Sequence, residues 1–264
     1  MITDKTKHHA IFTDIDGTLT AMGVTKYLTS DIIPDRNVKA IIAAQKKGHK
    51  IILNTGRGYA GLPKAAFEVI KADGYITGLG TYIEVEKKEL YNKPITKDIL
   101  EKLLDYIIEK NLPCRFQGKK TLIYHDEDTS LSPLWTRAKT KEEFFRILGD
   151  DYISKITVDS KLEGEYLEFV RSLLHTYASK GAGEAAMYGC DKSTAMRVVL
   201  EELGIPVERS IAMGDSSNDI EILRAAGTSV AMANASDDVK AVCDIVTLSD
   251  VEGGVGKAIE DLLL

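Results

Sequence analysis

The sequence predicts an α/β protein in which an inserted α+β module interrupts a core made of a parallel β-sheet covered by helices. Short apolar runs alternate with helix-like segments in the first part of the chain and again in the last part, which is the pattern of βαβ units. The middle part differs, because several short strands follow a single amphipathic helix there. We therefore expect a core formed by residues 1–85 and 188–264, with residues 86–187 as the inserted module.

The first part of the core contains two apolar runs that indicate buried strands, each followed by a polar turn. Gly48 is placed to end the helix between them, because glycine readily adopts the conformation that closes a helix. A helical crossover between two strands implies that they lie parallel in one sheet. The expected elements are strands at 9–15, 50–54 and 75–76, a helix from Pro34 to Gly48, and a helix over about 60–71.

The inserted module is predicted to begin with a helix that Thr96 caps and that carries an apolar stripe including Ile99, Leu103 and Ile107. Short segments of alternating polar and apolar residues follow it, and this alternation indicates strands with one buried face. The expected strands are 114–117, 121–125, 154–158, 176–179 and 185–188, with helices at 141–148 and about 165–173.

The last part of the core repeats the strand–helix alternation. Gly204 and Pro206 mark the end of a helix that begins near Ser193, and the next apolar run ends in Gly214 and Asp215. The expected elements are helices at 193–203 and 219–225, strands at 210–213 and 229–232, and further segments at 239–243, 245–247 and 255–263.

Two acidic residues, Asp14 and Asp16, lie where the first strand is predicted to end. Ligands of parallel α/β sheets bind at this carboxyl end of the strands. Gly17 permits the backbone to turn, so that both carboxylates can reach one site. Two acids this close repel each other, and a bound cation would relieve the repulsion. The pattern D-x-D-G-T alone is also compatible with an ordinary surface turn.

A second acidic loop runs from Gly214 to Asp219 after another apolar strand. Mg²⁺ prefers hard oxygen ligands, so Asp215 is a candidate partner of Asp14 in a metal site. Asp219 is a candidate to bind through water or to orient a ligand, and it could equally cap the next helix.

Two further features suit a phosphate group. Thr55, Gly56 and Arg57 follow the second strand, where a hydroxyl and backbone N–H groups can cradle an anion. Lys192 opens a helix before the second acidic loop, where its charge could neutralise phosphoryl oxygens and keep Asp14 ionised. Either feature alone is weak, because such turns and helix-start lysines are common.

Taken together, these motifs resemble the haloacid dehalogenase (HAD) superfamily, in its Cof-like branch (class IIB, with a C2-type cap). The segments that carry the resemblance are DIDGTLT, NTGR and GDSSNDIEILRAAGTSVAMANASDDVKAVCDIVT. The likeness extends over nearly the whole chain, although the inserted module matches only in placement and general pattern. It implies a Rossmann-like, doubly wound parallel sheet core with an inserted α+β cap domain.

The resemblance also implies a role for each motif residue. Asp14 would be the nucleophile that forms an aspartyl phosphate, and Asp16 would protonate the leaving oxygen and later activate water. Mg²⁺ would be held by Asp14, the backbone carbonyl of Asp16 and Asp215, with Asp219 also assigned to the metal site. The groups expected to hold the phosphoryl group are Thr55, the Gly56 backbone, Lys192 and Asn218. Arg57 is a candidate to touch the substrate, and it could equally only brace the loop.

The chain departs from the family pattern at two places. Relatives often show Asn-Gly-Ala before the cap, where this chain has Gly78-Leu79-Gly80-Thr81, and they often have glycine where Ser193 follows the motif lysine. Neither departure removes a catalytic group. We expect substrate preference to lie in the cap, around residues 114–125 and 131–137.

The bulk composition limits the partners that can be expected. The formal net charge is −6, so the chain lacks the basic field that nucleic acid or an anionic membrane requires. We find neither an export signal nor a run of transmembrane length, and the three cysteines show no metal-ligand spacing. We expect a cytoplasmic protein, either a monomer or a weak homo-oligomer.

The function expected from the sequence is a Mg²⁺-dependent phosphatase of small phosphorylated metabolites such as sugar phosphates. One alternative is a phosphomutase of sugar phosphates, which would return the phosphoryl group to a sugar. A second alternative is a catalytically weak sugar-phosphate-binding module. The complete set of motif residues, from Asp14 to Asp215, argues against the second alternative.

Overall fold

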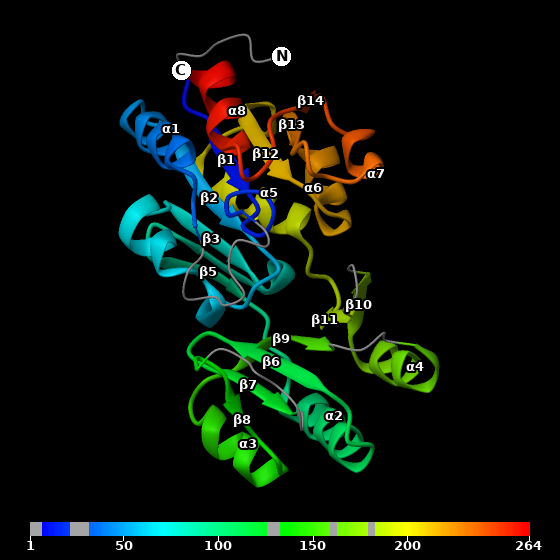
Figure 1. Ribbon diagram of the computed structural model, residues 1–264. Helices are drawn as coiled ribbons and strands as arrows, with labels where there is room; N and C mark the ends of the chain where they lie inside the picture. The colour runs from blue at the N-terminus through cyan, green and yellow to red at the C-terminus, as the bar shows by residue number, and fades with distance from the viewer. Residues whose placement is uncertain (1–6, 22–31, 126–132, 159–162, 179–182) are drawn as a thin grey trace.

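A sheet of eight strands forms the core of the protein (Figure 1). The computed structural model describes residues 7–21, 32–125, 133–158, 163–178 and 183–264. The strand order is β14-β13-β12-β1-β2-β3-β4-β5, and every neighbouring pair from β14 to β3 is parallel. Its strands are β1 (Ala10–Thr13), β2 (Lys50–Asn54), β3 (Gly74–Thr77), β4 (Tyr82–Val85), β5 (Lys88–Asn92), β12 (Ser210–Gly214), β13 (Thr228–Ala231) and β14 (Ile245–Val246).

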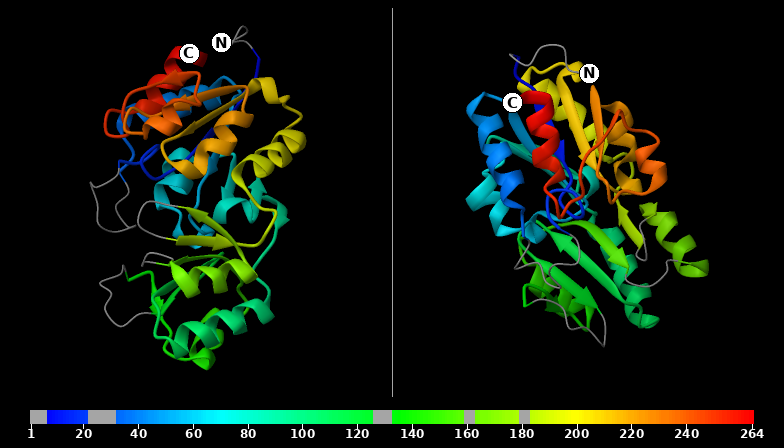
Figure 2. Two further views of the ribbon diagram at one scale, coloured as in Figure 1. Left: turned by 90° about the vertical axis from the view of Figure 1, so that its right-hand side faces the viewer. Right: turned by 45° about the horizontal axis from the view of Figure 1, so that its top comes forward.

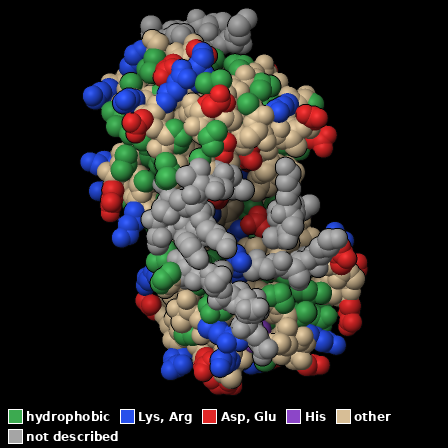
Figure 3. Space-filling model, viewed as in Figure 1, with side chains coloured by type: hydrophobic (Ala, Val, Ile, Leu, Met, Phe, Trp, Pro, Cys, Tyr) green, Lys and Arg blue, Asp and Glu red, His purple; other side chains and the backbone are tan. Residues whose placement is uncertain are grey.

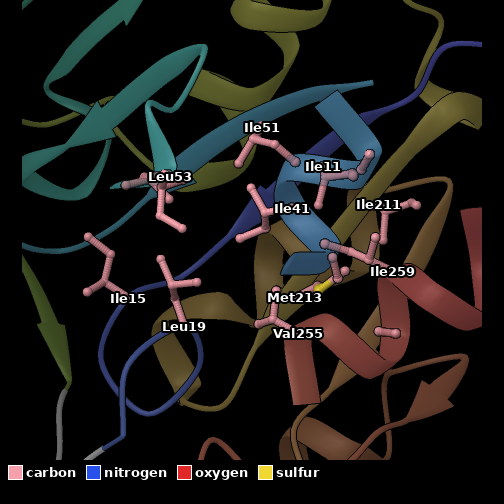
Figure 4. Close-up of a cluster of buried hydrophobic side chains, with 14 of the residues drawn as sticks. Ile11, Ile15, Leu19, Ile41, Ile51, Leu53, Ile211, Met213, Val255 and Ile259 are labelled. Atoms are coloured by element: carbon pink, nitrogen blue, oxygen red, sulfur yellow. The ribbon is translucent and has the colours of Figure 1, made fainter. Parts of the chain in front are cut away.

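Helices cover both faces of this sheet. Successive residues of a strand point to opposite sides, and both sides carry apolar side chains that must be buried. Ile11 and Ile51 pack toward one face, where α1 (Asp35–Lys46) and α8 (Gly254–Leu263) lie (Figure 4). Phe12 and Ile52 point to the other face, which is covered by α5 (Lys192–Leu203), α6 (Ile220–Ala225) and α7 (Asp237–Lys240). The core is therefore doubly wound, as the sequence predicted.

The inserted module has a sheet of its own, with the order β10-β11-β9-β6-β7-β8 (Figure 2). Apolar side chains on one face of this sheet pack against the helices of the module. Its elements are α2 (Lys97–Glu109), β6 (Cys114–Gly118), β7 (Leu122–His125), β8 (Thr136–Arg137), α3 (Lys141–Leu148), β9 (Ile153–Val158), α4 (Gly164–Leu173), β10 (His175–Ala178) and β11 (Gly183–Ala186).

Two local expectations were wrong. The helix expected over 60–71 is instead a 3₁₀ turn (Tyr59–Gly61) and a π-helical segment (Ala66–Ile70), because Pro63 between them lacks an N–H and disfavours helix in the residue before it. Thr96 precedes α2, but its hydroxyl donates to the Asp98 carboxylate (2.5 Å) instead of capping the backbone.

The boundary expected after residue 85 also needs correction. It falls between β4 and β5, and β5 pairs with β4 at the edge of the core sheet. We infer that the inserted module, hereafter the cap, begins after Asn92 and not at residue 86. Among the described residues, no helix has the length and apolar character needed to cross a bilayer.

The chain is tightly packed where β3 approaches the start of α5. Gly80 has φ 90°, and a Cβ atom added to it would lie 2.5 Å from the carbonyl oxygen of Asp191. Gly204, at the other end of α5, also has a positive φ of 62°, but an added Cβ would meet nothing within 4 Å. Alanine substitutions at these two glycines therefore distinguish the cost of a strained backbone conformation, which both share, from the cost of steric overlap, which arises only at Gly80.

Replacing Gly204 with alanine is expected to cost about 1 kcal/mol of stability, since only the left-handed backbone is strained. Gly80→Ala is expected to cost at least about 2 kcal/mol, because the backbone of Asp191 must also move. Urea denaturation of both variants and the wild type measures the two values. Equal losses would contradict the close approach at Gly80.

Candidate active site

Three strands bring the predicted site residues to one edge of the core sheet. In β1, Thr13 is in register with Leu53 of β2 and with Met213 of β12, so the three strands end together. Asp14 and Asp16 follow β1, Thr55 to Arg57 follow β2, and Asp215 follows β12. Parallel strands have their carboxyl ends at the same edge, and loops after them therefore converge.

Lys192 is the buried centre of this edge. Its ammonium donates hydrogen bonds to Asp14 Oδ1 (3.0 Å) and to Asp219 Oδ1 (2.6 Å), and only 3% of the residue is exposed. Burial lowers the pKa of Lys192, but the charges of Asp14 and Asp219 outweigh it and the pKa is raised overall. The side chain is therefore a permanent cation beneath Asp14, and not a solvated lysine at a helix start.

Three carboxylates lie close together beside Lys192, and two of them contact its ammonium group. Ligand atoms of Asp14, Asp215 and Asp219 lie within 4.8 Å of one another. Burial raises the pKa of Asp14 well above its usual value; Lys192 opposes this rise, while the neighbouring carboxylates add to it. Burial and the charge of Asp219 likewise raise the pKa of Asp215 to about 6. Such an excess of carboxylate oxygens suits a divalent cation such as Mg²⁺.

The three acids are not equivalent in this cluster. Asp219 uses Oδ1 for Lys192 and accepts the backbone N–H groups of Asp215 and Ser216 at Oδ2 (3.2 Å each). Asp215 accepts one hydrogen bond from the Thr18 hydroxyl (3.0 Å) at Oδ1. Asp14 and Asp215 thus offer oxygens to the cavity, whereas Asp219 braces the loop and the lysine.

Arg57 lies on Asp16 in this structure. Its Nε and Nη2 donate to the two carboxylate oxygens of Asp16 at 2.7 and 2.5 Å, and Nη1 donates to the carbonyl of Gly61. Burial raises the pKa of Asp16, but these hydrogen bonds and the charge of Arg57 lower it overall. The sequence left open whether Arg57 touches the substrate or braces the loop; in this structure it contacts the second acid and favours its ionised form.

The remaining predicted residues line the same cavity, which has a volume of about 810 Å³. Thr55 is buried, and its hydroxyl accepts the N–H of Arg57 (3.1 Å). The Asn218 carbonyl oxygen accepts hydrogen bonds from Lys192 (3.3 Å) and from the Ser216 hydroxyl (3.0 Å). Figure 3 shows the hollow between core and cap, with acidic and basic side chains inside it.

The structure adds cap residues to the site: Arg115 and Gln117 lie in the segment 114–125, where selectivity was expected, whereas Lys155, Thr157 and Glu184 were not foreseen. Five cap residues also line the cavity, and Gln117 among them accepts the N–H of Gly58 at Oε1 (2.9 Å). Their signal in the sequence is the alternation of polar and apolar residues in 114–118 and 153–158. It showed which face of each strand is polar, but not that this face meets Asp14. The five residues are Arg115, Gln117, Lys155, Thr157 and Glu184.

Comparison with known proteins agrees with this arrangement. A family model described as haloacid dehalogenase-like hydrolase matches residues 11–259. The chain is 29% identical to 5-amino-6-(5-phospho-D-ribitylamino)uracil phosphatase YcsE of Bacillus subtilis, over 95% of this chain and 98% of that protein. It is 26% identical to the chloroplastic endoribonuclease YBEY of Arabidopsis thaliana over 97% of this chain, which spans 46% of that longer protein.

A solved sugar phosphatase of HAD subclass IIB shares the fold, with a TM-score of 0.73 and 26% identity over 96% of this chain and 98% of that one. The doubly wound α/β core, the inserted cap and the acidic cluster at the carboxyl edge of the sheet define a capped enzyme of the Rossmann-like class. The chain belongs to the haloacid dehalogenase-like hydrolases. Within that family it is a phosphatase of the Cof-like branch, as the motifs predicted.

The raised pKa of Asp215 gives a pH-dependent cost to folding in the absence of metal. Below about pH 4 the carboxyl is protonated in both the folded and unfolded states, so it contributes nothing. Between pH 4 and about 6 only the unfolded state ionises freely, and above pH 6 the full cost remains. Asp215→Asn removes a charge that the metal-free fold holds unfavourably.

We therefore expect Asp215→Asn to stabilise the metal-free protein by about 1–3 kcal/mol at pH 8 and by nothing near pH 3.5. Urea denaturation in EDTA across this range measures the difference. Asp150→Asn is the matched control, because Asp150 is exposed and Lys120 lowers its pKa. A stabilisation that is the same at all pH values would contradict the assignment to Asp215.

Proposed function

We propose that this phosphatase is Mg²⁺-dependent and hydrolyses small phosphorylated metabolites, such as sugar phosphates, through an aspartyl phosphate on Asp14. The observation that carries the proposal is the buried Asp14 carboxylate, which Lys192 holds at 3.0 Å in a cavity that Asp16 also lines. A carboxylate held in this way can attack a phosphorus atom without first moving.

The reaction has two steps. In the first, an oxygen of Asp14 attacks phosphorus, the bond from phosphorus to the ester oxygen breaks, and Asp16, which must be in its protonated form for this step, gives its proton to that oxygen. In the second, Asp16 takes a proton from water, the resulting hydroxide attacks the phosphorus of the aspartyl phosphate, and Asp14 and inorganic phosphate are released. The same carboxyl thus acts as acid and then as base.

The residues of the cavity fit a divalent cation. Asp14 and Asp215, with the backbone carbonyl of Asp16, would hold Mg²⁺, and Asp219 would support the site through its bonds to Lys192 and the loop. Bound Mg²⁺ shields the charge of the phosphoryl group from the attacking carboxylate. Thr55, the Gly56 backbone, Lys192 and Asn218 would neutralise and orient the phosphoryl oxygens.

The cap supports a small substrate. Its residues close one side of a cavity of about 810 Å³, which is the size of a metabolite site. The solved relative of HAD subclass IIB is a sugar phosphatase, and each described residue that lines the cavity has a polar or charged side chain or is glycine. Both observations favour phosphorylated sugars and polyols.

We expect the wild type to release inorganic phosphate from part of a panel of sugar, polyol, nucleotide and aryl phosphates with Mg²⁺, and to lose this activity in EDTA. Asp14→Asn should reduce kcat at least ~10³-fold, since the nucleophile is lost. Asp105→Asn, on the exposed side of α2, is the control. A requirement for a bisphosphorylated sugar without net phosphate release would indicate a phosphomutase instead.

Removing the cation beside Asp16 should change the pH dependence of turnover. Arg57 lowers the pKa of Asp16, so Arg57→Met should raise that pKa. Hydrolysis of p-nitrophenyl phosphate, whose leaving group needs no proton, should depend on ionised Asp16 in the water step. The acidic limb of its kcat profile should therefore move to higher pH.

Arg57→Lys is expected to shift this limb less, because it keeps the charge but loses the two-pronged contact. The profiles are measured between pH 4 and 8 at saturating Mg²⁺. A loss of kcat with no movement of the limb would show that Arg57 supports the loop without setting the state of Asp16.

A further inference from the structure

One face of the cap sheet lies over the cavity, and its side chains are polar. In β6, Phe116 packs into the cap core, whereas the residues on either side of it line the cavity. In β9, Ile156 likewise packs into the cap core, and Lys155 and Thr157 line the cavity. This follows from the two-residue period of a strand. The pairings Glu184↔Thr157 and Thr157↔Arg115 form one row across the sheet, and Gln117↔Lys155 forms the next.

The lining of the cavity limits what the leaving group can be. Among the described residues that line it, every one is charged, carries a hydroxyl or amide, or is glycine. Small-molecule pockets are usually lined mostly by apolar and aromatic side chains. A flat base would find no ring to stack on among these residues, whereas a polyol can form hydrogen bonds on all sides.

The pair formed by Lys155 and Glu184 lines the same cavity as Asp14 and Asp16. Lys155 is 2% exposed and donates a hydrogen bond to Glu184. The Glu184 oxygens come within 3.4 and 3.7 Å of the position that a Cβ atom on Gly56 would occupy. The charge of Lys155 also contributes to the lowered pKa of Asp16. The pair therefore lies next to Gly56, and the charge of Lys155 acts on the acid that is proposed to protonate the ester oxygen.

We propose that Glu184 and Lys155 form the leaving-group subsite, and that this subsite selects phosphate esters of neutral polyols and sugars that carry a hydroxyl on the carbon next to the ester carbon. This inference rests on the proposed phosphatase reaction, in which the ester carbon lies beside Asp16. A carboxylate accepts hydrogen bonds from hydroxyl groups. An ammonium has three donors, so Lys155 can serve both Glu184 and a hydroxyl oxygen.

The same pair disfavours an ester whose ester carbon bears a carboxylate. Glu184 would repel that group, and Lys155 is already neutralised by Glu184. Arg115 is two strands away from Glu184 in the same row, which is about 10 Å at the usual strand spacing. Its guanidinium lies over the ring of Trp135, 5.8 Å from the ring centroid.

Three substrates with leaving groups of similar size test the proposal: glycerol 3-phosphate, 1-propyl phosphate and phosphoglycolate. They offer a neighbouring hydroxyl, no polar group and a carboxylate, respectively. With the wild type and Mg²⁺, kcat/KM should be at least ~10-fold higher for glycerol 3-phosphate than for either of the others, as expected for a hydrogen bond to a charged group. p-Nitrophenyl phosphate serves as the reference for the reaction itself.

In Glu184→Gln and in the double variant Lys155→Met/Glu184→Gln, the preference for glycerol 3-phosphate over 1-propyl phosphate should fall at least ~5-fold. Phosphoglycolate should improve relative to 1-propyl phosphate, because the repelling charge is gone. The double variant is included because a buried lysine without its partner destabilises the fold. Glu165→Gln, on the exposed side of α4, should keep the wild-type ratios.

The proposal is overturned if the wild type does not distinguish glycerol 3-phosphate from 1-propyl phosphate, or if it prefers phosphoglycolate. It is also overturned if both variants lower kcat/KM for all three esters by the same factor, since the pair would then be structural. If neither variant folds, the wild-type ratios alone decide. An absence of turnover even with p-nitrophenyl phosphate would instead refute the phosphatase reaction on which the proposal rests.

Discussion

The burial of Lys192 between Asp14 and Asp219 constrains the rest of this site. A buried ammonium is stable only if carboxylates compensate its lost hydration, so both acids must be held close to it, at 3.0 and 2.6 Å. Those acids come from loops after β1 and β12, which are neighbours in the sheet. The acidic cluster therefore depends both on the parallel register of β1 and β12, which brings the two loops together, and on the start of α5, which supplies Lys192.

Much of this arrangement could be predicted from the sequence. Apolar runs ending in acids placed Asp14 and Asp215 at the carboxyl edge of a parallel sheet, because strand direction alone brings such loops together. The antiparallel hairpin of β4 and β5 at the sheet edge was not foreseen. Its residues between Tyr82 and Asn92 show neither a clear turn signal nor the apolar character of a buried strand, and they were partly assigned to the cap.

Side-chain pairing across the site was the part that could not be predicted. Arg57 is two residues from Thr55 in the chain, and the sequence could not decide whether it touches the substrate or braces the loop. Its partner, Asp16, is 41 residues away, and only the packed loops show that the guanidinium fits both carboxylate oxygens. Lys155, Thr157 and Glu184 of the cap were missed for a similar reason: alternation identifies a polar face, but the orientation of the cap decides what that face meets.

The loop from Thr55 to Arg57, which is proposed to bind the phosphoryl group, contacts both the core and the cap. Gly56 lies between Leu79 of the core, whose Cδ2 is 3.4 Å from an added Cβ position, and Glu184 of the cap. Leu79 holds its place in a left-handed conformation, with φ 63°, which costs about 1–2 kcal/mol for a residue with a Cβ atom. Its complete burial offsets this strain. Because the loop is held from both sides, the proposed phosphoryl site would have a fixed position relative to Glu184 before a substrate binds, and the proposed selectivity for the leaving group would act close to the ester oxygen.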